Sequence, residues 1–480
     1  MYDNQNNWPC KGSRSKRLRS YLKCRGGKTV RIEYTCGNTA LSKNINDLNL
    51  ELIGSEENEI INEINKLRAN TIKTHDLPLQ YTIDLLDQCG KLWLNREYSK
   101  KHVEILSHIL SQSKELVIYE LEHTMQMLLK ENLEKTIKEE LGTKEVLDTW
   151  VNTGYGKVHR QPRGVIFHNI SGNAFVVVPT SISMGLLSKN CNLVKVSGDE
   201  PYFAYAFYNS LCEIDPSIKD RLSVIYFNSE YSNIYKTIVK NTDCVIHWGG
   251  EHSGRMMGEL CAKFDNHLIM HGAKISFEVI DKINNANHTA DLIARDVICW
   301  EQKACLSPRI VFVNKNLDTK QLAQAIADKL KEYTTILPKA YLNPWNSMKI
   351  IQDRQYCLLK YGVKKQQNVE LYSSYNADYT VILNDSLLDK EDIDRCFNRF
   401  IFVCPYESSD EVLEYINNNL KSYLQTMGYS GDNEEFIEKM TLLGVSIVTK
   451  PGDMSIHYPG TSHDGFHNLQ EMTYVVSRQL

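Results

Sequence analysis

Cys305 is the residue of this chain best suited to covalent chemistry. It lies between an apolar segment that ends at Ile298 and a short apolar strand predicted at 310–313, and its neighbours are small or polar. Most buried cysteines are inert, but a sulfur in this setting can be reached by a substrate. Its reactivity depends on the thiolate, which nearby hydrogen-bond donors favour. The chain has 13 cysteines, so the surroundings of Cys305 must carry its assignment as a nucleophile.

Ser171, Gly172 and Asn173 follow a strand predicted at 164–170. Gly172 allows a ligand to approach the backbone closely, and the Asn173 amide can donate a hydrogen bond to an oxyanion. The alternative is an ordinary turn, in which these residue types are common. Their place at the carboxyl end of a strand favours a functional role.

A second group follows the strand predicted at 244–247 and opens a helix: Trp248, Gly249, Gly250 and Glu251. Paired glycines at a helix N-terminus let backbone N–H groups approach a phosphate or a nicotinamide ring. The usual GxGxxG pattern is absent, so a plain strand-to-helix turn is the alternative.

Lys195 and Ser197 lie at the end of the strand predicted at 192–196. An ammonium and a hydroxyl at a strand end suit the ribose or phosphate of an adenosine. The alternative for Lys195 is a solvated surface lysine.

His463, Asp464 and His467 form a separate cluster near the C-terminus. Two histidines four residues apart can hold a metal on a helix, but Gly465 weakens that helix and no third ligand is evident. A hydrogen-bonded structural His-Asp pair is the preferred interpretation, and no metal site is predicted.

Short strands and helices of about ten residues alternate from Tyr155 onward, which predicts a parallel sheet with right-handed crossovers. Ligands bind at the carboxyl ends of such strands. A second α/β region follows, and the stretch 340–375 has no clear pattern. The stretch 77–150 has helical periodicity. Residues 1–74 are polar and irregular apart from a helix around 56–68. A strand at 472–476 would complete a sheet in this subunit or in a neighbour.

Four segments result from this pattern. They are a poorly defined N-terminal extension at 1–74, a helical segment with a dinucleotide-binding α/β domain at 75–281, a catalytic α/β domain at 282–448, and a C-terminal segment at 449–480 that returns to the cofactor domain or to an oligomer interface.

Composition excludes several classes of protein. The chain has 480 residues, 42% of them apolar, and a net charge of only −4, so nothing points to a nucleic-acid partner. The basic run from Lys11 to Arg31 is interpreted as a poorly ordered tail. No CxxC pair and no stretch of 18 apolar residues occurs, which predicts neither a disulfide framework nor a membrane span. The free thiols and the absence of a signal peptide favour the cytoplasm.

In their order along the chain, several segments resemble the acyl-CoA reductase family typified by the long-chain fatty acyl-CoA reductase of bacterial luminescence operons, a branch of the aldehyde dehydrogenase superfamily. The resemblance runs from about 77 to 480. The matching segments are 93–99, 140–142 with Trp150, 171–173, 248–251, 272–277 before Asp281, 302–305, and 463–465 with 469–470. It implies an aldehyde dehydrogenase-like fold with two Rossmann-type α/β domains.

The resemblance also implies roles for individual residues. Cys305 is the expected nucleophile, and Asn173 is expected in the oxyanion hole. The expected cofactor contacts are Ser171, Gly172, Lys195 at the adenosine ribose, Ser197, Trp248, Gly249, Gly250, Glu251 and Gly272. Glu251 departs from the small hydroxyl usual in the superfamily, and no residue near Phe400 matches the glutamate that holds the nicotinamide ribose.

Met270 is expected in the place of the glutamate that hydrolytic aldehyde dehydrogenases use as a general base. Methionine cannot take a proton from water, so an acyl–sulfur intermediate would survive for reduction; the neighbouring His271 remains a conceivable weak base. The expected reaction is NADPH-dependent reduction of a fatty acyl thioester to the aldehyde. NADPH is preferred to NADH because Gly198 replaces a glutamate that repels the 2′-phosphate, although Asp199 follows it. The expected partners are acyl-CoA or an acylated synthetase protein, and a second copy of the chain.

Three alternatives remain open on the sequence. A hydrolytic aldehyde dehydrogenase would oxidise aldehydes to acids but needs a general base. A thiol acyltransferase would use Cys305 without any nucleotide. In a non-catalytic scaffold, Cys305 would be a core residue.

Overall fold

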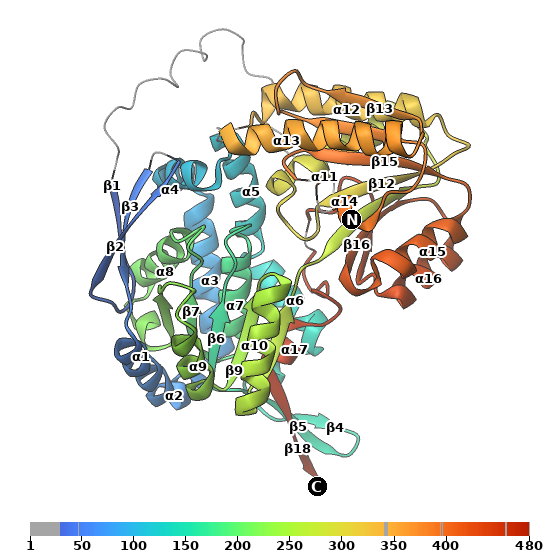
Figure 1. The fold of residues 1–480 in the computed structure, drawn as a ribbon. Coiled ribbons are helices and arrows are strands. Elements are labelled where there is room, and N and C mark those ends of the chain that lie inside the picture. The colour runs from blue at the N-terminus through green and yellow to red at the C-terminus, as the bar shows by residue number, and fades with distance from the viewer. Residues whose placement is uncertain are drawn as a thin grey trace.

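A computed structural model describes residues 29–46, 48–339, 344–393, 395, 397–456 and 458–479. Two sheets covered by helices form two neighbouring bodies, and a small three-stranded arm projects from the first of them (Figure 1). The basic run predicted as a tail lies outside the described residues except for its last member, Arg31. Within the described residues, no helix has the length and apolar character that crossing a bilayer requires.

The first body is built on a five-stranded parallel sheet with the strand order β10-β9-β6-β7-β8. Its strands are β6 (Val165–Asn169), β7 (Cys191–Lys195), β8 (Leu222–Ile225), β9 (Cys244–Trp248) and β10 (His267–His271). Its helices are α7 (Val177–Leu187), α8 (Phe203–Ile214), α9 (Ser232–Asn241) and α10 (Glu251–Phe264), with a 3-10 turn at Pro216–Asp220. The chain runs outward from β6 through β7 to β8 and then returns to β9 on the other side of β6. The carboxyl ends of β6 and β9 therefore mark a switch point, where open α/β sheets bind ligands.

The second body is built on a seven-stranded sheet with the order β13-β14-β15-β12-β11-β16-β17, in which only the β13–β14 pair is antiparallel. Its strands are β11 (Ile275–Ile280), β12 (Pro308–Asn314), β13 (Val369–Ser373), β14 (Thr380–Asn384), β15 (Phe400–Tyr406), β16 (Leu424–Ser430) and β17 (Ile447–Thr449). Its helices are α11 (Ala286–Ile298), α12 (Thr319–Ile336), α13 (Pro344–Cys357), α14 (Lys390–Ile393), α15 (Ser409–Asn419) and α16 (Glu434–Leu443), with a 3-10 turn at Lys421–Tyr423. The stretch without a clear pattern contains α13 and a π-helical turn at Leu358–Lys364.

The predicted helical stretch is confirmed as a layer of helices beside the first sheet. It contains α3 (Leu79–Leu94), α4 (Arg96–Leu110), α5 (Lys114–Gln126) and α6 (Lys130–Leu141), followed by a 3-10 turn at Lys144–Leu147. Trp93 of α3 is buried against Phe203 and donates its ring N–H to Ser210 Oγ at 2.8 Å. A buried ring N–H needs an acceptor, and here the acceptor is a residue of α8. This hydrogen bond therefore joins the helical layer to α8.

The expectation of irregular structure before the first predicted helix is wrong for the described residues. They form a small sheet of β1 (Thr29–Glu33), β3 (Leu48–Gly54) and β2 (Thr39–Ile45), in that order, followed by α1 (Glu57–Ala69) and α2 (Thr71–His75). Leu48, Leu50 and Leu52 alternate with polar residues and are buried. This alternation of apolar and polar residues, with a period of two, is the sequence signal of a half-buried strand, and it was missed.

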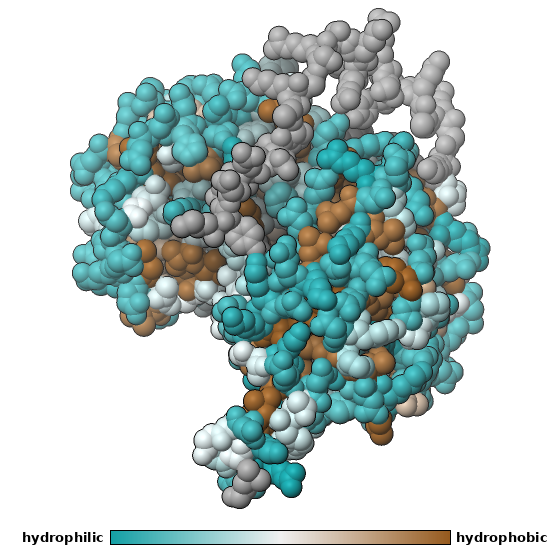
Figure 2. All heavy atoms as spheres, turned by 180° about the vertical axis from the view of Figure 1, so that it is seen from behind, coloured by the Kyte–Doolittle hydropathy of each residue, from teal (hydrophilic) through white to brown (hydrophobic). Residues whose placement is uncertain are grey.

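The C-terminal strand pairs within this chain. After α17 (Asn468–Glu471), β18 (Thr473–Gln479) runs antiparallel to β5 (Gly156–Pro162), which also pairs with β4 (Val151–Thr153). These three strands form the arm that stands away from the body in Figures 1 and 2. Tyr474 and Val475 on the arm are exposed.

Candidate active site

A cavity of about 830 Å³ lies at the carboxyl ends of the first sheet and extends to the loop before β12. Its size suits a dinucleotide-sized ligand. It is lined by all eleven residues that the sequence singled out, namely Ser171, Gly172, Asn173, Lys195, Ser197, Trp248, Gly249, Gly250, Glu251, Gly272 and Cys305. The parallel strands bring ten of these residues together because their carboxyl ends share one edge of the sheet, and Cys305 joins them from the loop before β12.

Two glycines let backbone segments meet at this edge. A Cβ on Gly172 would lie 2.8 Å from Ser197 Oγ and 2.9 Å from the backbone nitrogen of Glu200. A Cβ on Gly249 would lie 2.7 Å from His247 Nε2. A side chain at Gly172 would push the backbone at Glu200 out of place, and one at Gly249 would displace the His247 and Ser253 side chains.

Lys195 is a buried cation at the end of β7. Its Nζ donates to Ser229 Oγ at 2.7 Å and lies over the rings of Phe227 and Tyr235. Burial lowers the pKa of Lys195 to about 8. A buried ammonium with few fixed partners favours a ligand that offers hydroxyl or phosphate oxygens.

The turn that leads to Cys305 has an uncommon backbone. Trp300, Glu301 and Gln302, in the 3-10 turn Cys299–Gln302, all have left-handed φ angles, of 59°, 49° and 58°. Such residues persist only where the surroundings hold them, and they gather at functional sites.

Buried polar groups hold this turn. Arg399 forms a two-pronged ion pair with Glu301, with distances of 2.7 and 3.1 Å. Gln302 exchanges two hydrogen bonds with the backbone of Phe400, at 2.7 and 3.0 Å. The backbone N–H of Trp300 donates to Glu120 Oε1 at 2.7 Å. The turn is thereby tied to both α5 and β15, so the position of Cys305 depends on all of these contacts.

Cys305 is half-buried and lines the cavity. Burial raises the pKa of its thiol to about 11, and the nearby charge of Asp464 acts in the same direction. A hydrogen bond with Gln425 and the N–H groups of Cys305 and Leu306 oppose this rise without overcoming it. The resting side chain is therefore a thiol at neutral pH.

Asn173 connects the first sheet to the cysteine loop. Its Nδ2 donates to the carbonyl oxygen of Lys303 at 2.8 Å, and its Oδ1 accepts from Ser171 at 2.5 Å. An amide has two N–H donors, so one remains after the bond to Lys303. The exposed Asn173 side chain therefore holds the cysteine loop at Lys303, two residues before Cys305.

Met270, which is expected in the place of the general-base glutamate, is not among the residues that line the cavity. A Cβ on Gly254 of α10 would lie 3.2 Å from the Met270 sulfur, so Met270 packs toward that helix. His271 lines the cavity instead. The two neighbours separate because successive side chains of a strand point to opposite faces.

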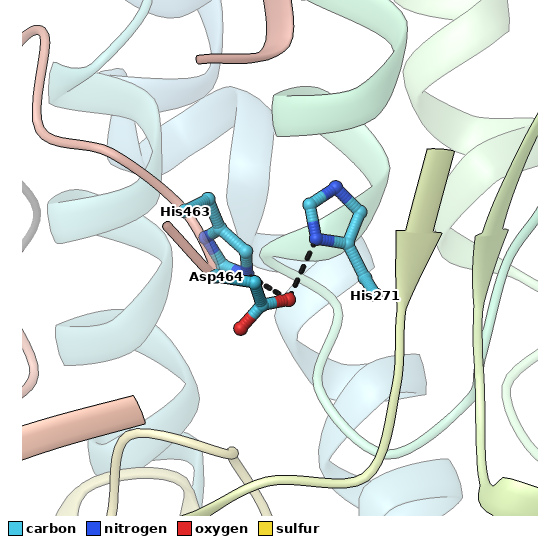
Figure 3. Close-up of side chains that lie close together, drawn as sticks. All are labelled: His271, His463 and Asp464. Atoms are coloured by element: carbon cyan, nitrogen blue, oxygen red, sulfur yellow. Dashed lines mark hydrogen bonds and ion pairs between the residues drawn. The ribbon is translucent and has the colours of Figure 1, made fainter. Parts of the chain in front are cut away.

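His271 belongs to a polar cluster that the sequence did not predict as a unit (Figure 3). Its Nδ1 lies 2.8 Å from Asp464 Oδ2, and its Nε2 lies 3.1 Å from Asn468 Oδ1. His463 Nε2 lies 3.8 Å from Asp464 Oδ2, too far for a hydrogen bond. Asp464 therefore forms a hydrogen-bonded His-Asp pair, but with His271 and not with the histidines at 463 and 467 that the sequence suggested.

This cluster also borders the thiol and the base of the cavity. The Trp248 ring stacks on His271 with centroids 3.8 Å apart, so the indole itself is buried. Gln425 donates to Asp464 Oδ1 at 2.8 Å and hydrogen-bonds Cys305. Ligand atoms of His271, His463 and Asp464 lie within 4.8 Å of one another, a spacing that could suit a metal. The hydrogen bonds account for both nitrogens of His271, so we interpret the cluster as a hydrogen-bond network.

Other lining residues were missed by the sequence reasoning. Arg309 stacks over the Phe397 ring at 4.0 Å, and Lys390 and Tyr423 line the same side of the cavity. Arg309 lies in β12, Lys390 begins α14 and Tyr423 precedes β16, and no local pattern marks them. Gln425 near the thiol was missed because its strand, β16, was not predicted.

A second, smaller cavity of about 150 Å³ adjoins the cysteine loop. Val176, Leu306 and His463 line both cavities, and Met184, Trp300 and Ile456 line only the smaller one. The residue after Cys305 therefore stands at the junction between the two spaces.

Comparison with known proteins extends over most of the chain. The family described as "Acyl-CoA reductase (LuxC)" matches residues 74–475. A protein named long-chain acyl-protein thioester reductase from Photorhabdus luminescens is 25% identical over 448 residues, which cover 91% of this chain and 89% of that protein. The protein of the same name from Vibrio harveyi is 24% identical over 457 residues, covering 90% and 92%. The predicted resemblance is confirmed.

Solved structures agree on the fold. Aldehyde dehydrogenase 21 from Physcomitrella patens, in complex with succinate, has a TM-score of 0.75 at 14% identity and covers 95% of this chain and 99% of its own. An aldehyde dehydrogenase of Mycobacterium tuberculosis complexed with NAD+ has a TM-score of 0.70 at 12% identity, with the same coverage. The aldehyde dehydrogenase-like α/β fold is confirmed.

Proposed function

The chain belongs to the acyl-CoA reductase (LuxC) family, and on that premise we propose that it reduces a fatty acyl thioester to the aldehyde with NADPH, carrying the acyl group on Cys305. The observation that carries the proposal is that Cys305 lines the larger cavity while Leu306, the next residue, lines both cavities. The larger suits a dinucleotide, and the smaller suits the start of an acyl chain. We propose that the acyl donor is an acylated protein, as in the names of the relatives, or acyl-CoA.

The residues around the larger cavity fit a nicotinamide dinucleotide. Gly172 and Gly249 allow close backbone contact, and α10 begins at Glu251 with its N-terminus toward the cavity. Lys195 and Ser197 would hold the adenosine ribose, and Gly250, Glu251 and Gly272 would border the pyrophosphate and nicotinamide. When bound, NADPH supplies the hydride that reduces the acyl carbon.

The first step is a thiol exchange at Cys305. Its sulfur bonds to the acyl carbon as the thiol loses its proton, and the bond from that carbon to the donor sulfur breaks. The departing sulfur takes up a proton, so the exchange is balanced. The remaining N–H of Asn173 would donate to the carbonyl oxygen as charge develops there, and one such donor lowers a barrier by roughly 3 kcal/mol.

Hydrolysis of the acyl–sulfur bond needs a group that takes a proton from water. Both nitrogens of His271 face oxygen acceptors, the Asp464 carboxylate and the Asn468 carbonyl. Both ring nitrogens are therefore already engaged in hydrogen bonds within the protein. This arrangement supports reduction over the hydrolytic alternative.

Mass spectrometry tests the proposal. The protein is mixed with acyl-CoA without reductant, and the expected result is an acyl adduct on the peptide that contains Cys305. Addition of NADPH should remove the adduct and release aldehyde. Cys305→Ala should not load, whereas Cys212→Ala, which changes another half-buried thiol, should load like the wild type.

Other outcomes would favour the alternatives. Release of free acid without NADPH would indicate a hydrolytic enzyme. Transfer of the acyl group to a second thiol, with no consumption of NADPH, would indicate an acyltransferase. Equal loading of Cys305→Ala would refute the assignment of Cys305 as the nucleophile.

We further propose a cytoplasmic homo-oligomer that uses the β4–β5–β18 arm as an interface.

A further inference from the structure

The N-terminal sheet of β1, β2 and β3 precedes the residues matched by the family. It is hydrogen-bonded to the first sheet near the carboxyl ends of its strands, where the dinucleotide is proposed to bind. The Thr35 backbone N–H donates to Val224 O of the edge strand β8 at 2.9 Å, and that of Ser55 donates to Tyr226 O at 2.7 Å. Tyr34 donates from its hydroxyl to Pro201 O at 2.7 Å. The sheet is therefore held against the loops that follow β7 and β8, and its position relative to the cavity is defined.

Lys43 of β2 reaches from this sheet into the loop after β7. Its Nζ donates to Gly198 O at 2.6 Å. Gly198 lies between Ser197 and Asp199, which both line the larger cavity. A Cβ on Gly198 would lie only 3.1 Å from Lys43 Nζ, so the absence of a side chain there makes room for the ammonium.

The charges at this rim leave Lys43 available to an anion. Gly198 O accepts one of the three ammonium hydrogens, and Asp199 Oδ1 at 4.0 Å is beyond hydrogen-bond distance. The Asp199 side chain is 90% exposed, so it can turn into solvent at little cost. Lys43 itself is about one-third exposed, so its ammonium is open to solvent next to Gly198, whose neighbours Ser197 and Asp199 line the cavity.

We infer that Lys43 binds the 2′-phosphate of the cofactor and is a determinant of the preference for NADPH over NADH. The inference rests on the proposed function, because it requires the adenosine ribose to lie at Lys195 and Ser197. The loop that would contact the ribose hydroxyls is the loop that Lys43 holds. A phosphate on the 2′-oxygen would add two negative charges beside this ammonium, and a charge-assisted contact favours binding.

Binding of small nucleotides tests the inference without catalysis. Affinities for adenosine 2′,5′-bisphosphate and for AMP are measured by titration calorimetry. We expect the wild type to prefer the bisphosphate and Lys43→Met to lose that preference by roughly 10-fold or more, the usual size of a hydrogen bond to a charged group. AMP affinity should change less than about 2-fold, because AMP has no phosphate on the 2′-oxygen for Lys43 to contact.

Matched variants separate recognition from structure. Lys43→Arg keeps the charge and should retain most of the preference. Lys73→Met removes an exposed lysine that pairs with Asp220 far from the rim, and should bind both nucleotides like the wild type. Asp199→Asn should increase affinity for the bisphosphate.

The results also distinguish this inference from the proposed function. If Lys43→Met keeps the wild-type ratio, or weakens both nucleotides equally, the inference is wrong and the reductase proposal stands. If the wild type binds AMP without preferring the bisphosphate, the inference is again wrong, and NADH becomes the proposed cofactor. If the wild type binds neither nucleotide nor NADPH, both proposals fail.

Discussion

His271 Nδ1 lies 2.8 Å from Asp464 Oδ2, although 193 residues separate them in the chain. The pair joins the end of β10 in the first body to the segment that follows β17 of the second (Figure 3). Asp464 also accepts a hydrogen bond from Gln425, and Gln425 in turn forms a hydrogen bond with the Cys305 thiol. The protonation of the cysteine thus depends on a contact between distant parts of the chain.

Reaction of Cys305 with iodoacetamide should follow an unusually high pH profile. Burial raises the pKa of this thiol to about 11, whereas an ordinary thiol has a pKa near 8.5. The rate at the Cys305 peptide, followed by mass spectrometry, should keep rising above pH 9. Asp464→Asn should move the profile to lower pH because it removes a negative charge beside the sulfur. Asp432→Asn, at an exposed ion pair with Lys282, should leave it unchanged. A plateau near pH 8.5 in the wild type would contradict the prediction.

Arg399→Met should destabilise the protein by about 3–5 kcal/mol, because it leaves Glu301 buried without its partner. The same change should reduce acyl loading, since this ion pair holds the turn before Cys305. Arg96→Met breaks an exposed pair with Glu122 and should cost less than about 1 kcal/mol. Urea unfolding measures both variants. Equal stability of the two would show that the buried pair does not hold the turn.

Gly172→Ala should weaken NADPH binding by roughly 10-fold or more, because the new methyl group meets Ser197 Oγ and the backbone of Glu200. Displacing this backbone moves the whole loop. Gly258→Ala is the matched control, since a Cβ there has open space within α10. Fluorescence titration with NADPH measures both variants, and an unchanged affinity of Gly172→Ala would argue that the nucleotide binds elsewhere.

Glu120→Gln should reduce the dependence of stability on pH. Burial raises the pKa of Glu120 to about 8 from its ordinary 4.5. The folded state therefore binds a proton that the unfolded state loses between these values, so the stabilisation present below pH 4.5 declines as pH rises to about 8. Glutamine stays neutral and can still accept from the Trp300 N–H. Unfolding free energies measured from pH 5 to 9 should fall less steeply in the variant than in the wild type; parallel curves would contradict this account.

The positions of the eleven predicted cavity residues followed from local patterns. Buried apolar runs such as 192–196 identify strands, and Gly172 and Gly249 mark the turns after them. Parallel strands place these turns at one edge, so neighbours in space can be inferred without any knowledge of side-chain packing. The alternating leucines of β3 are also a local signal of a strand, but the polar residues around them favour irregular structure.

The amino-acid sequence by itself determined the parallel sheet of the first body, part of the second sheet, the crevice at the strand ends and the candidate thiol, since each depends on short-range periodicity and on the conformational freedom of glycine. Tertiary structure alone decided that His271 rather than Met270 lines the cavity, because one residue of register reverses the side of a strand. It also decided which partners Asp464, Gln425 and Lys43 have. These contacts cross large separations in the chain, and their geometry depends on how the packed sheets and helices meet.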